Sequence, residues 1–178
     1  AFDKTGTLTY GRPVLAQVHS ADCTGAETCP ACDDLLALAN AVEAQTAHPL
    51  ARAITQAAET RALSTVYPPA EAVELLPGRG VRGQVNHQQV TLGSHRFFDE
   101  SLPHSPELCH LIQAAEADGQ TTLLVAENDQ VRGFLSLTDA VRPVSQQVVR
   151  ELTAQGITTV MLTGDHAAAA THVAGQVG

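Results

Sequence analysis

The chain has 178 residues, of which 44% are hydrophobic, so it can bury the core of one large domain or two small ones. Its formal net charge of −9 and the absence of any run of Lys or Arg argue against a nucleic acid or an anionic membrane surface as its partner. No segment approaches the roughly 20 apolar residues that cross a bilayer, and we expect this stretch of chain to be soluble.

The first third of the chain predicts one strand and two helices after a short apolar segment that ends at Asp3. The strand is expected at 13–18, and a loop from His19 to about Ala31 follows it. Apolar residues at helical spacing then predict a helix from Asp33 to Thr46, and Pro49 suits the first turn of a second helix that ends near Arg61.

The middle of the chain is typical of a sheet built from hairpins. We expect strands at 72–76, 81–85 and 89–92, separated by the turns Pro77-Gly78-Arg79-Gly80 and Asn86-His87. A helix at 106–118 ends at Gly119, and strands at 121–126 and 131–137 flank an Asn128-Asp129 turn. The sheet is therefore expected to be largely antiparallel.

After Asp139 the pattern changes to a helix at 143–155, a strand at 157–162 and a loop that opens another helix, which is typical of a βαβ unit. We therefore predict an α/β domain that is split by an inserted α+β domain. The expected boundaries give residues 1–13 and 133–178 to the split domain and residues 14–132 to the inserted one.

The segment from Asp3 to Thr9 carries the parts of a phosphate-handling site. A carboxylate that attacks a phosphoryl group needs a metal to offset its charge and small donors to hold the phosphate oxygens, and Asp3, Thr5, Gly6 and Thr7 can supply such parts. An ordinary strand followed by a Thr/Gly turn is the alternative interpretation.

This seven-residue segment resembles the phosphorylation motif of the P-type ATPases, ion pumps that form an aspartyl-phosphate on a domain of the haloacid dehalogenase class. The resemblance implies that Asp3 is the nucleophile, that Lys4 and Thr5 are catalytic, and that Asp3 and Thr5 bind Mg²⁺. Many phosphatases of this class resemble the pattern Asp-x-Asp, and Thr5 stands at the position of their second aspartate. Without that second acid, the site is expected to form the acyl-phosphate without hydrolysing it promptly, as a pump requires if phosphorylation must outlast a conformational change.

Two later segments extend the resemblance. Thr163-Gly164-Asp165 is similar to a phosphate-binding loop of the same pumps, although an isolated tripeptide of this kind is also a common helix N-cap. The segment from Leu137 to Pro143 resembles the family's hinge, in which Asp139 is implied to be functional. The alternatives for Asp139 are a cap for the helix that begins near Pro143 or an ion pair with Arg142.

The inserted domain carries a nucleotide signature. The segment from Ala47 to Ile54 resembles the His-Pro signature of the heavy-metal branch of these pumps, and Gly78, Gly80 and Gly93 resemble its partner glycines. The resemblance implies that His48 meets a purine, while Glu43 can accept a hydrogen bond from an adenine amine and glycines let a nucleotide approach the backbone. Taken alone, a histidine at such a position is more often a loop or capping residue.

Three cysteines and one histidine lie within fourteen residues, at His19, Cys23, Cys29 and Cys32. Such side chains can hold Zn²⁺ in a tetrahedral site, and a Cys-x-x-Cys before a helix can also be a redox pair. Unliganded loop thiols are the third interpretation. Cys109 is interpreted as a small residue on a helix face.

These resemblances together imply the ATP-binding, autophosphorylating, cytoplasmic part of a heavy-metal P-type ATPase that uses ATP and Mg²⁺. Its implied partners are nucleotide and the transmembrane and actuator domains of the same protein, at the cytoplasmic face of the plasma membrane. The family's later Gly-Asp-Gly segment does not occur before Gly178, so we expect a fragment that binds nucleotide and phosphorylates poorly. Arg142 favours the zinc, cadmium, cobalt and lead branch over copper. A soluble phosphatase with a cap domain and a nucleotide- or metal-sensing module are the alternatives.

Overall fold

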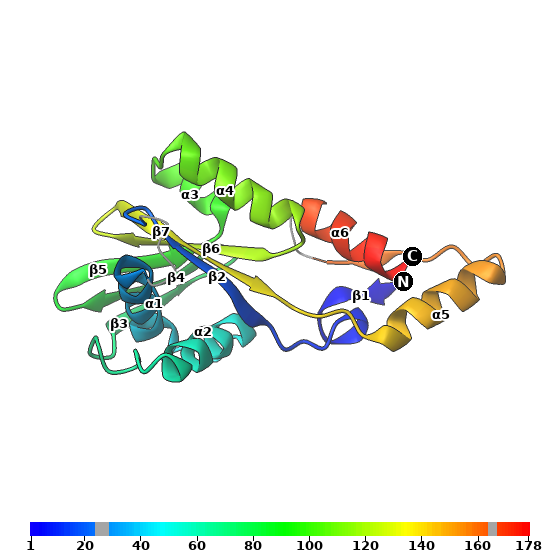
Figure 1. Ribbon diagram of the computed structural model, residues 1–178, viewed down its shortest axis with the longest axis horizontal. Coiled ribbons are helices and arrows are strands. Elements are labelled where there is room, and N and C mark those ends of the chain that lie inside the picture. Colours follow the sequence, from blue (N-terminus) through cyan, green and yellow to red (C-terminus); the bar gives the residue numbers. More distant parts are fainter. Residues whose placement is uncertain (24–28, 164–166) are drawn as a thin grey trace.

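The computed structural model describes residues 1–23, 29–163 and 167–178, and it describes the side chains of all of these except 167–169. Its largest feature is a six-stranded sheet in which every pair of neighbours is antiparallel, in the order β2-β7-β6-β5-β4-β3 (Figure 1). The strands are β2 (Val14–Ser20), β3 (Glu71–Leu76), β4 (Gly80–Val85), β5 (Gln88–Gly93), β6 (Thr121–Glu127) and β7 (Gln130–Thr138). The expectation of a largely antiparallel sheet is confirmed.

Both two-residue turns of this sheet were predicted, and their backbones show why these residues occupy them. Asn86 and His87 have φ of 50° and 65°, and Asn128 and Asp129 have φ of 46° and 64°. Two successive residues with positive φ form the type I′ turn, whose twist matches that of the flanking strands. Asparagine tolerates this conformation better than most residues do, which is why it marks both turns in the sequence.

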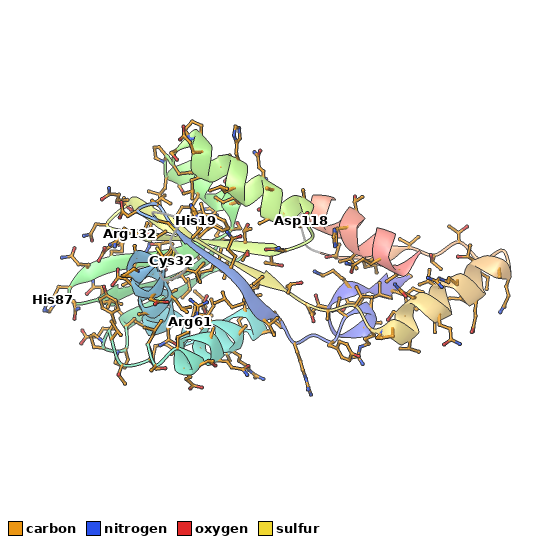
Figure 2. All side chains as sticks on the ribbon, in the orientation of Figure 1. His19, Cys32, Arg61, His87, Asp118 and Arg132 are labelled. Atoms are coloured by element: carbon orange, nitrogen blue, oxygen red, sulfur yellow. The ribbon has the colours of Figure 1, made fainter. Side chains whose placement is uncertain are left out.

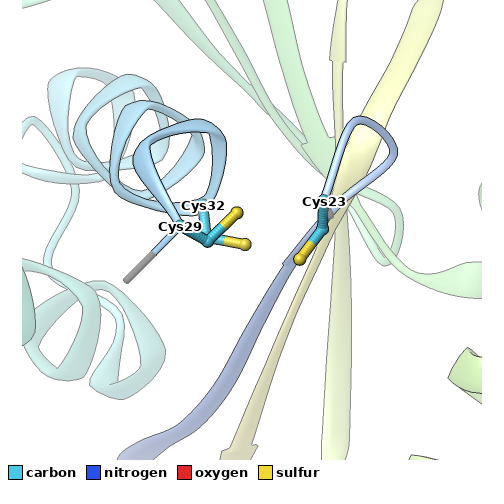
Figure 3. Close-up of side chains that lie close together, drawn as sticks. All are labelled: Cys23, Cys29 and Cys32. Carbon is cyan, nitrogen blue, oxygen red and sulfur yellow. The ribbon is translucent and has the colours of Figure 1, made fainter. Parts of the chain in front are cut away.

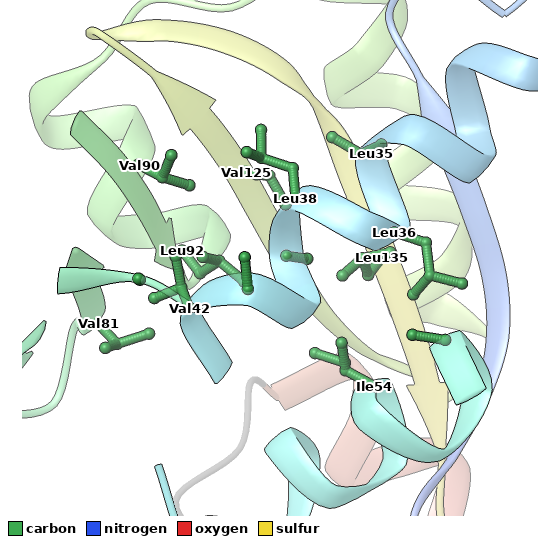
Figure 4. Close-up of a cluster of buried hydrophobic side chains, with 14 of the residues drawn as sticks. Leu35, Leu36, Leu38, Val42, Ile54, Val81, Val90, Leu92, Val125 and Leu135 are labelled. Carbon is green, nitrogen blue, oxygen red and sulfur yellow. The ribbon is translucent and has the colours of Figure 1, made fainter. Parts of the chain in front are cut away.

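Helices cover the two faces of the sheet, two on each (Figure 1). On one face lie α1 (Pro30–Glu43) and α2 (Pro49–Thr60), and on the other lie α3 (His95–Ser101) and α4 (Pro106–Ala117). Under α1 and α2 the core is aliphatic and includes Leu36, Val42, Ile54, Leu92 and Leu135, all almost fully buried (Figure 4). Under α3 and α4 a second core is built around Phe98 and Phe134.

The remaining elements lie together at one end of the sheet (Figure 1). They are β1 (Phe2–Asp3), a single π-type turn (Lys4–Leu8), α5 (Pro143–Ala154), β8 (Met161–Leu162) and α6 (Ala167–Val177). Strands β1 and β8 pair in parallel, and the backbone NH of Phe2 donates to the carbonyl of Val160 at 2.8 Å. Parallel pairing of strands separated by the whole inserted sheet is the α/β arrangement that the sequence predicted.

Three elements differ from expectation. Helix α1 begins at Pro30 instead of Asp33, because proline fits the first turn of a helix, where its missing NH costs nothing. Helix α3 was not predicted at all. Strand β8 has two residues instead of the expected six, and the side chains of Ile157 and Val160 are about half exposed. The chain is expected to return from the inserted domain to the split domain near residue 133, but that position lies inside β7, which continues in the large sheet to Thr138.

Candidate functional site

The pairing of β1 with β8 places Asp3 at the carboxyl end of a parallel strand. Asp3 is opposite Leu162, so Thr163 follows at the same edge of this small sheet. Ligands of open α/β sheets bind at the carboxyl ends of the strands, which is where Asp3 stands with an exposed side chain. Thr163 is partly buried, whereas Gly164 and Asp165 lie outside the described residues.

The turn after Asp3 folds back on itself and leaves its polar residues outside. Thr5 has an extended backbone and Gly6 a φ of 80°, so the chain reverses at a glycine. The backbone NH of Thr9 donates to the carbonyl of Lys4, and the NH of Gly6 donates to the hydroxyl of Thr9. Lys4 is buried, while Thr5, Gly6 and Thr7 are exposed beside Asp3.

Asp139 joins the two crossings, the chain segments that connect the large sheet to the end of the molecule holding β1 and β8. Its Oδ2 accepts a hydrogen bond of 2.6 Å from the hydroxyl of Thr9 and one of 3.1 Å from the NH of Gly11, and its Oδ1 accepts one of 3.1 Å from the NH of Arg12. The carboxylate thus bonds to residues that lie 127 to 130 positions earlier in the chain. Neither of the sequence-based alternatives describes this contact, since Asp139 joins the two crossings and does not cap α5.

Arg142 reinforces the same junction from the other side. Its guanidinium donates to the carbonyls of Thr9 at 2.8 Å and Gly6 at 3.1 Å and lies over the ring of Tyr10. Arg142 is also the N-cap position of α5 and makes no side-chain cap there. A cavity of about 430 Å³ borders this junction, between α5, α6 and the end of α4, and is lined by Asp139 and Arg142.

Glu43 and His48 lie at the connection between α1 and α2. Glu43 is 6% exposed, and burial raises the pKa of its carboxyl, partly offset by a hydrogen bond from the hydroxyl of Thr46 and by the charge of His48. His48 is exposed and caps α2, since its Nδ1 accepts a 3.3 Å hydrogen bond from the NH of Leu50. The cap uses the Nδ1 lone pair and leaves Nε2 and the ring face outside.

The buried carboxyl predicts a pH-dependent stability. A raised pKa means that the folded protein holds its proton more tightly than the unfolded chain, so Glu43 costs stability as the pH rises from 4.5 through its raised pKa. Glu43→Gln keeps the shape and the acceptor for Thr46. We expect the variant to melt at a higher temperature than the wild type at pH 8, and the difference to vanish at pH 4. Melting curves of both proteins across this range check it, and a difference independent of pH would contradict the assignment.

The three glycines of the nucleotide signature are placed by β4 and β5. Gly80 pairs with Gly93 across the two strands, and a Cβ on Gly80 would lie 1.9 Å from the carbonyl oxygen of Leu92. A Cβ on Gly93 would lie 2.7 Å from the ring of Phe97. Both glycines are therefore required by close packing of the protein itself. Gly78, with a φ of 69° and nothing within 4 Å, is exposed in the turn before them.

Glu43 and the glycine pair lie at the same end of the sheet. Val42 packs in one cluster with Val81 and Leu92, and Figure 4 shows it beside Leu92. Val81 and Leu92 are the pair next to Gly80 and Gly93 in the register, so the end of α1 reaches that end of the hairpin. The structure thus brings the end of α1, which carries Glu43, toward Gly80 and Gly93, whereas Asp3 and Thr163 form a separate group.

The three sulfurs of Cys23, Cys29 and Cys32 lie within 4.8 Å of one another. Figure 3 shows the thiols of Cys29, the N-cap residue of α1, and Cys32, in its first turn, facing Cys23, which follows β2 by three residues. Burial is the main cause that raises the pKa of the Cys32 thiol to about 12. His19, the fourth expected ligand, is not in this group: it lies on β2 with its ring 5.7 Å from that of Phe134 (Figure 2).

A second group of metal-ligating side chains was not predicted. His95, His104 and Cys109 bring their ligand atoms within 4.8 Å of one another on α3, α4 and the segment between them. No spacing of ligand residues in the sequence points to this group, since the sequence pattern does not predict α3 and Cys109 is interpreted there as a helix-face residue. None of the helices in the part of the chain that the structure covers is long and apolar enough to cross a membrane.

Comparison with known proteins places these features in context. The family model for haloacid dehalogenase-like hydrolases matches residues 1–178. The zinc/cadmium/lead-transporting P-type ATPase of Escherichia coli K12 is 39% identical over the whole chain, which spans 22% of that relative. The copper-exporting P-type ATPase of Vibrio cholerae is 37% identical over 99% of the chain, which spans 18% of that relative. The chain thus covers about a fifth of these relatives.

The fold is also found among solved structures. The crystal structure of a zinc-transporting PIB-type ATPase in its E2.Pi state superposes with a TM-score of 0.68. It is 38% identical to this chain and covers 99% of it, and the match takes up 27% of that protein.

Proposed function

Because this chain belongs to the haloacid dehalogenase-like hydrolases, and within them to the heavy-metal P-type ATPases, we propose that it is the ATP-binding and autophosphorylating part of such a pump. The observation that carries the proposal is the position of Asp3. It heads the segment Asp-Lys-Thr-Gly-Thr-Leu-Thr at the carboxyl end of a parallel strand, beside Thr163 on the neighbouring strand.

In this proposal an oxygen of the Asp3 carboxylate attacks the terminal phosphorus of ATP, the bond to the bridging oxygen breaks, and ADP leaves. Thr163 and the turn around Lys4 and Thr5 hold the phosphoryl oxygens, and Gly164 and Asp165 complete that loop. The hydroxyl of Thr5 does not ionise near neutral pH, so it cannot replace a carboxylate as the acid or base that would hydrolyse the acyl-phosphate. The phosphorylated state therefore persists.

The residues around Asp3 suit Mg²⁺. Mg²⁺ prefers one or two carboxylates together with phosphate oxygens and water, and Asp3 is an exposed carboxylate with the exposed Thr5 close by in sequence. When bound, Mg²⁺ would supply the positive charge that offsets the phosphate oxygens. In a chain of net charge −9 such local neutralisation is needed, because the overall field repels a nucleotide.

We assign nucleotide binding to the part built on the large sheet and phosphoryl transfer to the rest of the chain, with the second boundary moved from residue 133 to the end of β7 at Thr138, which gives residues 14–138 to the first part and residues 1–13 and 139–178 to the second. The exposed ring of His48 would stack on adenine, and Glu43 would accept from its amine. Gly78, the one glycine of the three with open space where its Cβ would be, would let the nucleotide approach the backbone, while Gly80 and Gly93 shape the strands beneath it.

His48 offers the direct test, provided that its capping role is separated from its ring. His48→Ala removes both, whereas His48→Asn keeps a side chain that is a good N-cap. We expect calorimetric titration to show adenine-selective binding of ATP by the wild type and binding at least about 10-fold weaker in both variants, since a stacked, hydrogen-bonded purine is worth more than about 1.4 kcal/mol. Only His48→Ala should also lose about 1 kcal/mol of stability.

Other outcomes favour the alternatives. ATP binding that is weak in His48→Ala but normal in His48→Asn would show that the capping role of His48 matters and that its ring does not contact the nucleotide. Rapid turnover of a small phosphate ester that is lost in Asp3→Asn would favour a soluble phosphatase with a cap domain. Adenine-selective binding together with slow or absent turnover supports the pump.

For the transported metal we propose only a class of heavy-metal ion. Relatives named for zinc, cadmium and lead and relatives named for copper match at similar identity. Arg142 inclines the proposal toward the zinc, cadmium, cobalt and lead branch, although the structure uses its guanidinium at the junction with Thr9 and Gly6. The proposed partners are the transmembrane and actuator domains of the same pump, with this part at the cytoplasmic face of the plasma membrane.

The thiols of Cys23, Cys29 and Cys32 support a second binding role. Three sulfurs within 4.8 Å of one another suit a zinc-class ion, with a fourth ligand from outside the group. We expect the wild-type chain to bind Co²⁺ with sulfur-to-metal charge-transfer absorption that Cys23→Ser/Cys29→Ser greatly reduces. Absorption that the double variant leaves unchanged would mean that these are unliganded thiols.

A further inference from the structure

A second cluster of ligand atoms lies on the opposite face of the sheet, between α3 and α4. Nε2 of His95 is 3.5 Å from Oδ1 of Asp99 and 3.6 Å from Sγ of Cys109, and Nε2 of His104 is 3.4 Å from the same Asp99 oxygen. The side chains of His95 and His104 are 9% and 5% exposed. The ligand atoms of His95, His104 and Cys109 lie within 4.8 Å of one another, and the half-exposed Asp99 carboxylate borders both imidazoles.

The outer nitrogen of each imidazole faces an acceptor. Nδ1 of His95 is 3.5 Å from Oε2 of Glu116, and Nδ1 of His104 is 3.3 Å from the carbonyl oxygen of Leu102. In the tautomer that carries its hydrogen on Nδ1, each imidazole donates to that acceptor and keeps an Nε2 lone pair. Nε2 of each ring faces the Asp99 carboxylate, and Nε2 of His95 also faces the sulfur of Cys109, so a bound cation would select this tautomer.

Three distances in this group can be compared with the edges of a coordination sphere. A tetrahedral zinc ion with bonds of roughly 2.0–2.1 Å to nitrogen, about 2.0 Å to oxygen and about 2.3 Å to sulfur has N···O edges of about 3.3 Å and N···S edges of about 3.5 Å. The distances found, 3.4 and 3.5 Å for N···O and 3.6 Å for N···S, match these edges. The ligand atoms of His95, His104 and Cys109 all lie within 4.8 Å of one another, and the half-exposed Asp99 carboxylate, which is outside that group, would turn toward the sulfur to complete the sphere. A cation at the centre would turn the mutual repulsion of four acceptors into attraction.

The surroundings of the ligands complete the pattern of a metal site. Histidine ligands commonly donate their outer NH to a carboxylate or a carbonyl, which fixes the ring orientation. Glu116, which faces His95, is itself held by a 2.6 Å hydrogen bond from the hydroxyl of Thr122. The amide of Gln113 lies 3.3 Å from Sγ of Cys109 and donates to it, as suits a thiolate.

From this juxtaposition we propose a tetrahedral site for a zinc-class divalent ion, with His95, Asp99, His104 and Cys109 as ligands and Glu116 as a positioning residue. Two imidazoles, one thiolate and one carboxylate form a donor set that suits Zn²⁺ and Co²⁺ better than Mg²⁺ or Ca²⁺. The ion would join α3, the segment after it and α4. The proposal is independent of ATP binding and of Asp3.

The test uses Co²⁺ as a spectroscopic probe in a Cys23→Ser/Cys29→Ser background, which removes the other thiol group. We expect one equivalent of Co²⁺ to give the intense visible bands of tetrahedral cobalt together with a thiolate charge-transfer band, and Zn²⁺ to displace it. Cys109→Ser should abolish the charge-transfer band, and His104→Gln should weaken affinity more than about 100-fold. Glu116→Gln, which touches no metal, should weaken it about 10- to 100-fold.

His110→Gln is the matched control, since this exposed histidine lies on the same helix next to Cys109. It should bind Co²⁺ as the background protein does. A pale octahedral spectrum in the background protein, or tetrahedral cobalt that His104→Gln and Cys109→Ser leave unchanged, would overturn the site.

A measurement without any change to the ligands guards against variants that fail to fold. Saturating Zn²⁺ should protect the partly exposed thiol of Cys109 from alkylation, and a chelator should restore its reactivity, as peptide mass spectrometry would show. Equal rates of alkylation with and without Zn²⁺ would contradict the proposal.

Discussion

Gly80→Ala is expected to destabilise the protein by about 3 kcal/mol or more. Its Cβ would lie 1.9 Å from the carbonyl oxygen of Leu92 and 2.6 Å from the Cα of Gly93, both of them backbone atoms that no rotamer change can move. Overpacking of this kind costs about 1–3 kcal/mol, and a residue other than glycine at a φ of 154° adds backbone strain of similar size. Denaturant unfolding would measure the loss.

Gly78→Ala is the matched control two residues away. A Cβ there meets nothing within 4 Å, and only the φ of 69° opposes it, at a cost of about 1 kcal/mol. If Gly80→Ala were as stable as Gly78→Ala, the β4–β5 pairing would not require Gly80. For ATP binding we expect a direct effect at Gly78. Gly78→Ala should still fold but should bind the nucleotide more weakly than the wild type, because the space beside the Gly78 backbone is open.

Asp139→Ala is expected to loosen the junction between the two parts of the chain and to lower stability by about 2–4 kcal/mol. The carboxylate accepts three hydrogen bonds, from the Thr9 hydroxyl and from the backbone of Gly11 and Arg12, and bonds to a charged acceptor contribute roughly 1.5–3 kcal/mol each when buried and less where water reaches them. Hydrogen exchange at the amides of Gly11 and Arg12 should accelerate, which tests the mechanism apart from global stability.

Asp129→Asn serves as the control for charge alone, because Asp129 stands in the exposed β6–β7 turn, where asparagine accepts the same backbone. It should leave both the stability and the exchange rates near those of the wild type. If Asp139→Ala unfolded no more readily than Asp129→Asn, the carboxylate would contribute nothing to the junction. Protection of Gly11 and Arg12 that survived in Asp139→Ala would point the same way.

The fold was predictable wherever a local signal agreed with the tertiary structure. Asparagine-containing turns located both type I′ hairpins, and prolines located the first turns of α2, α4 and α5. Helix α3 was missed because it has only seven residues, too few for a helical period to emerge. Its signal was Ser94, whose hydroxyl accepts from the NH of Phe97 as an N-cap, but a single cap residue marks many turns as well.

The site was predictable as residue types and less so as contacts. The sequence pattern indicated Asp139 but could not show that its carboxylate accepts hydrogen bonds from residues about 130 positions earlier, because no local pattern reports that proximity. It grouped His19 with the three cysteines by spacing, whereas the alternation of β2 sends the imidazole toward Phe134. It also missed the group at His95, whose members come together only through the packing of α3 on α4.

The two crossings run side by side well beyond the sheet. Strands β2 and β7 pair as far as Val14 and Thr138, and an isolated antiparallel bridge joins Thr9 and Val141 beyond them. Two paired segments resist stretching and shear along their hydrogen bonds more than bending across their thin dimension. We therefore expect bending at these segments to be the easiest motion of the large sheet relative to Asp3.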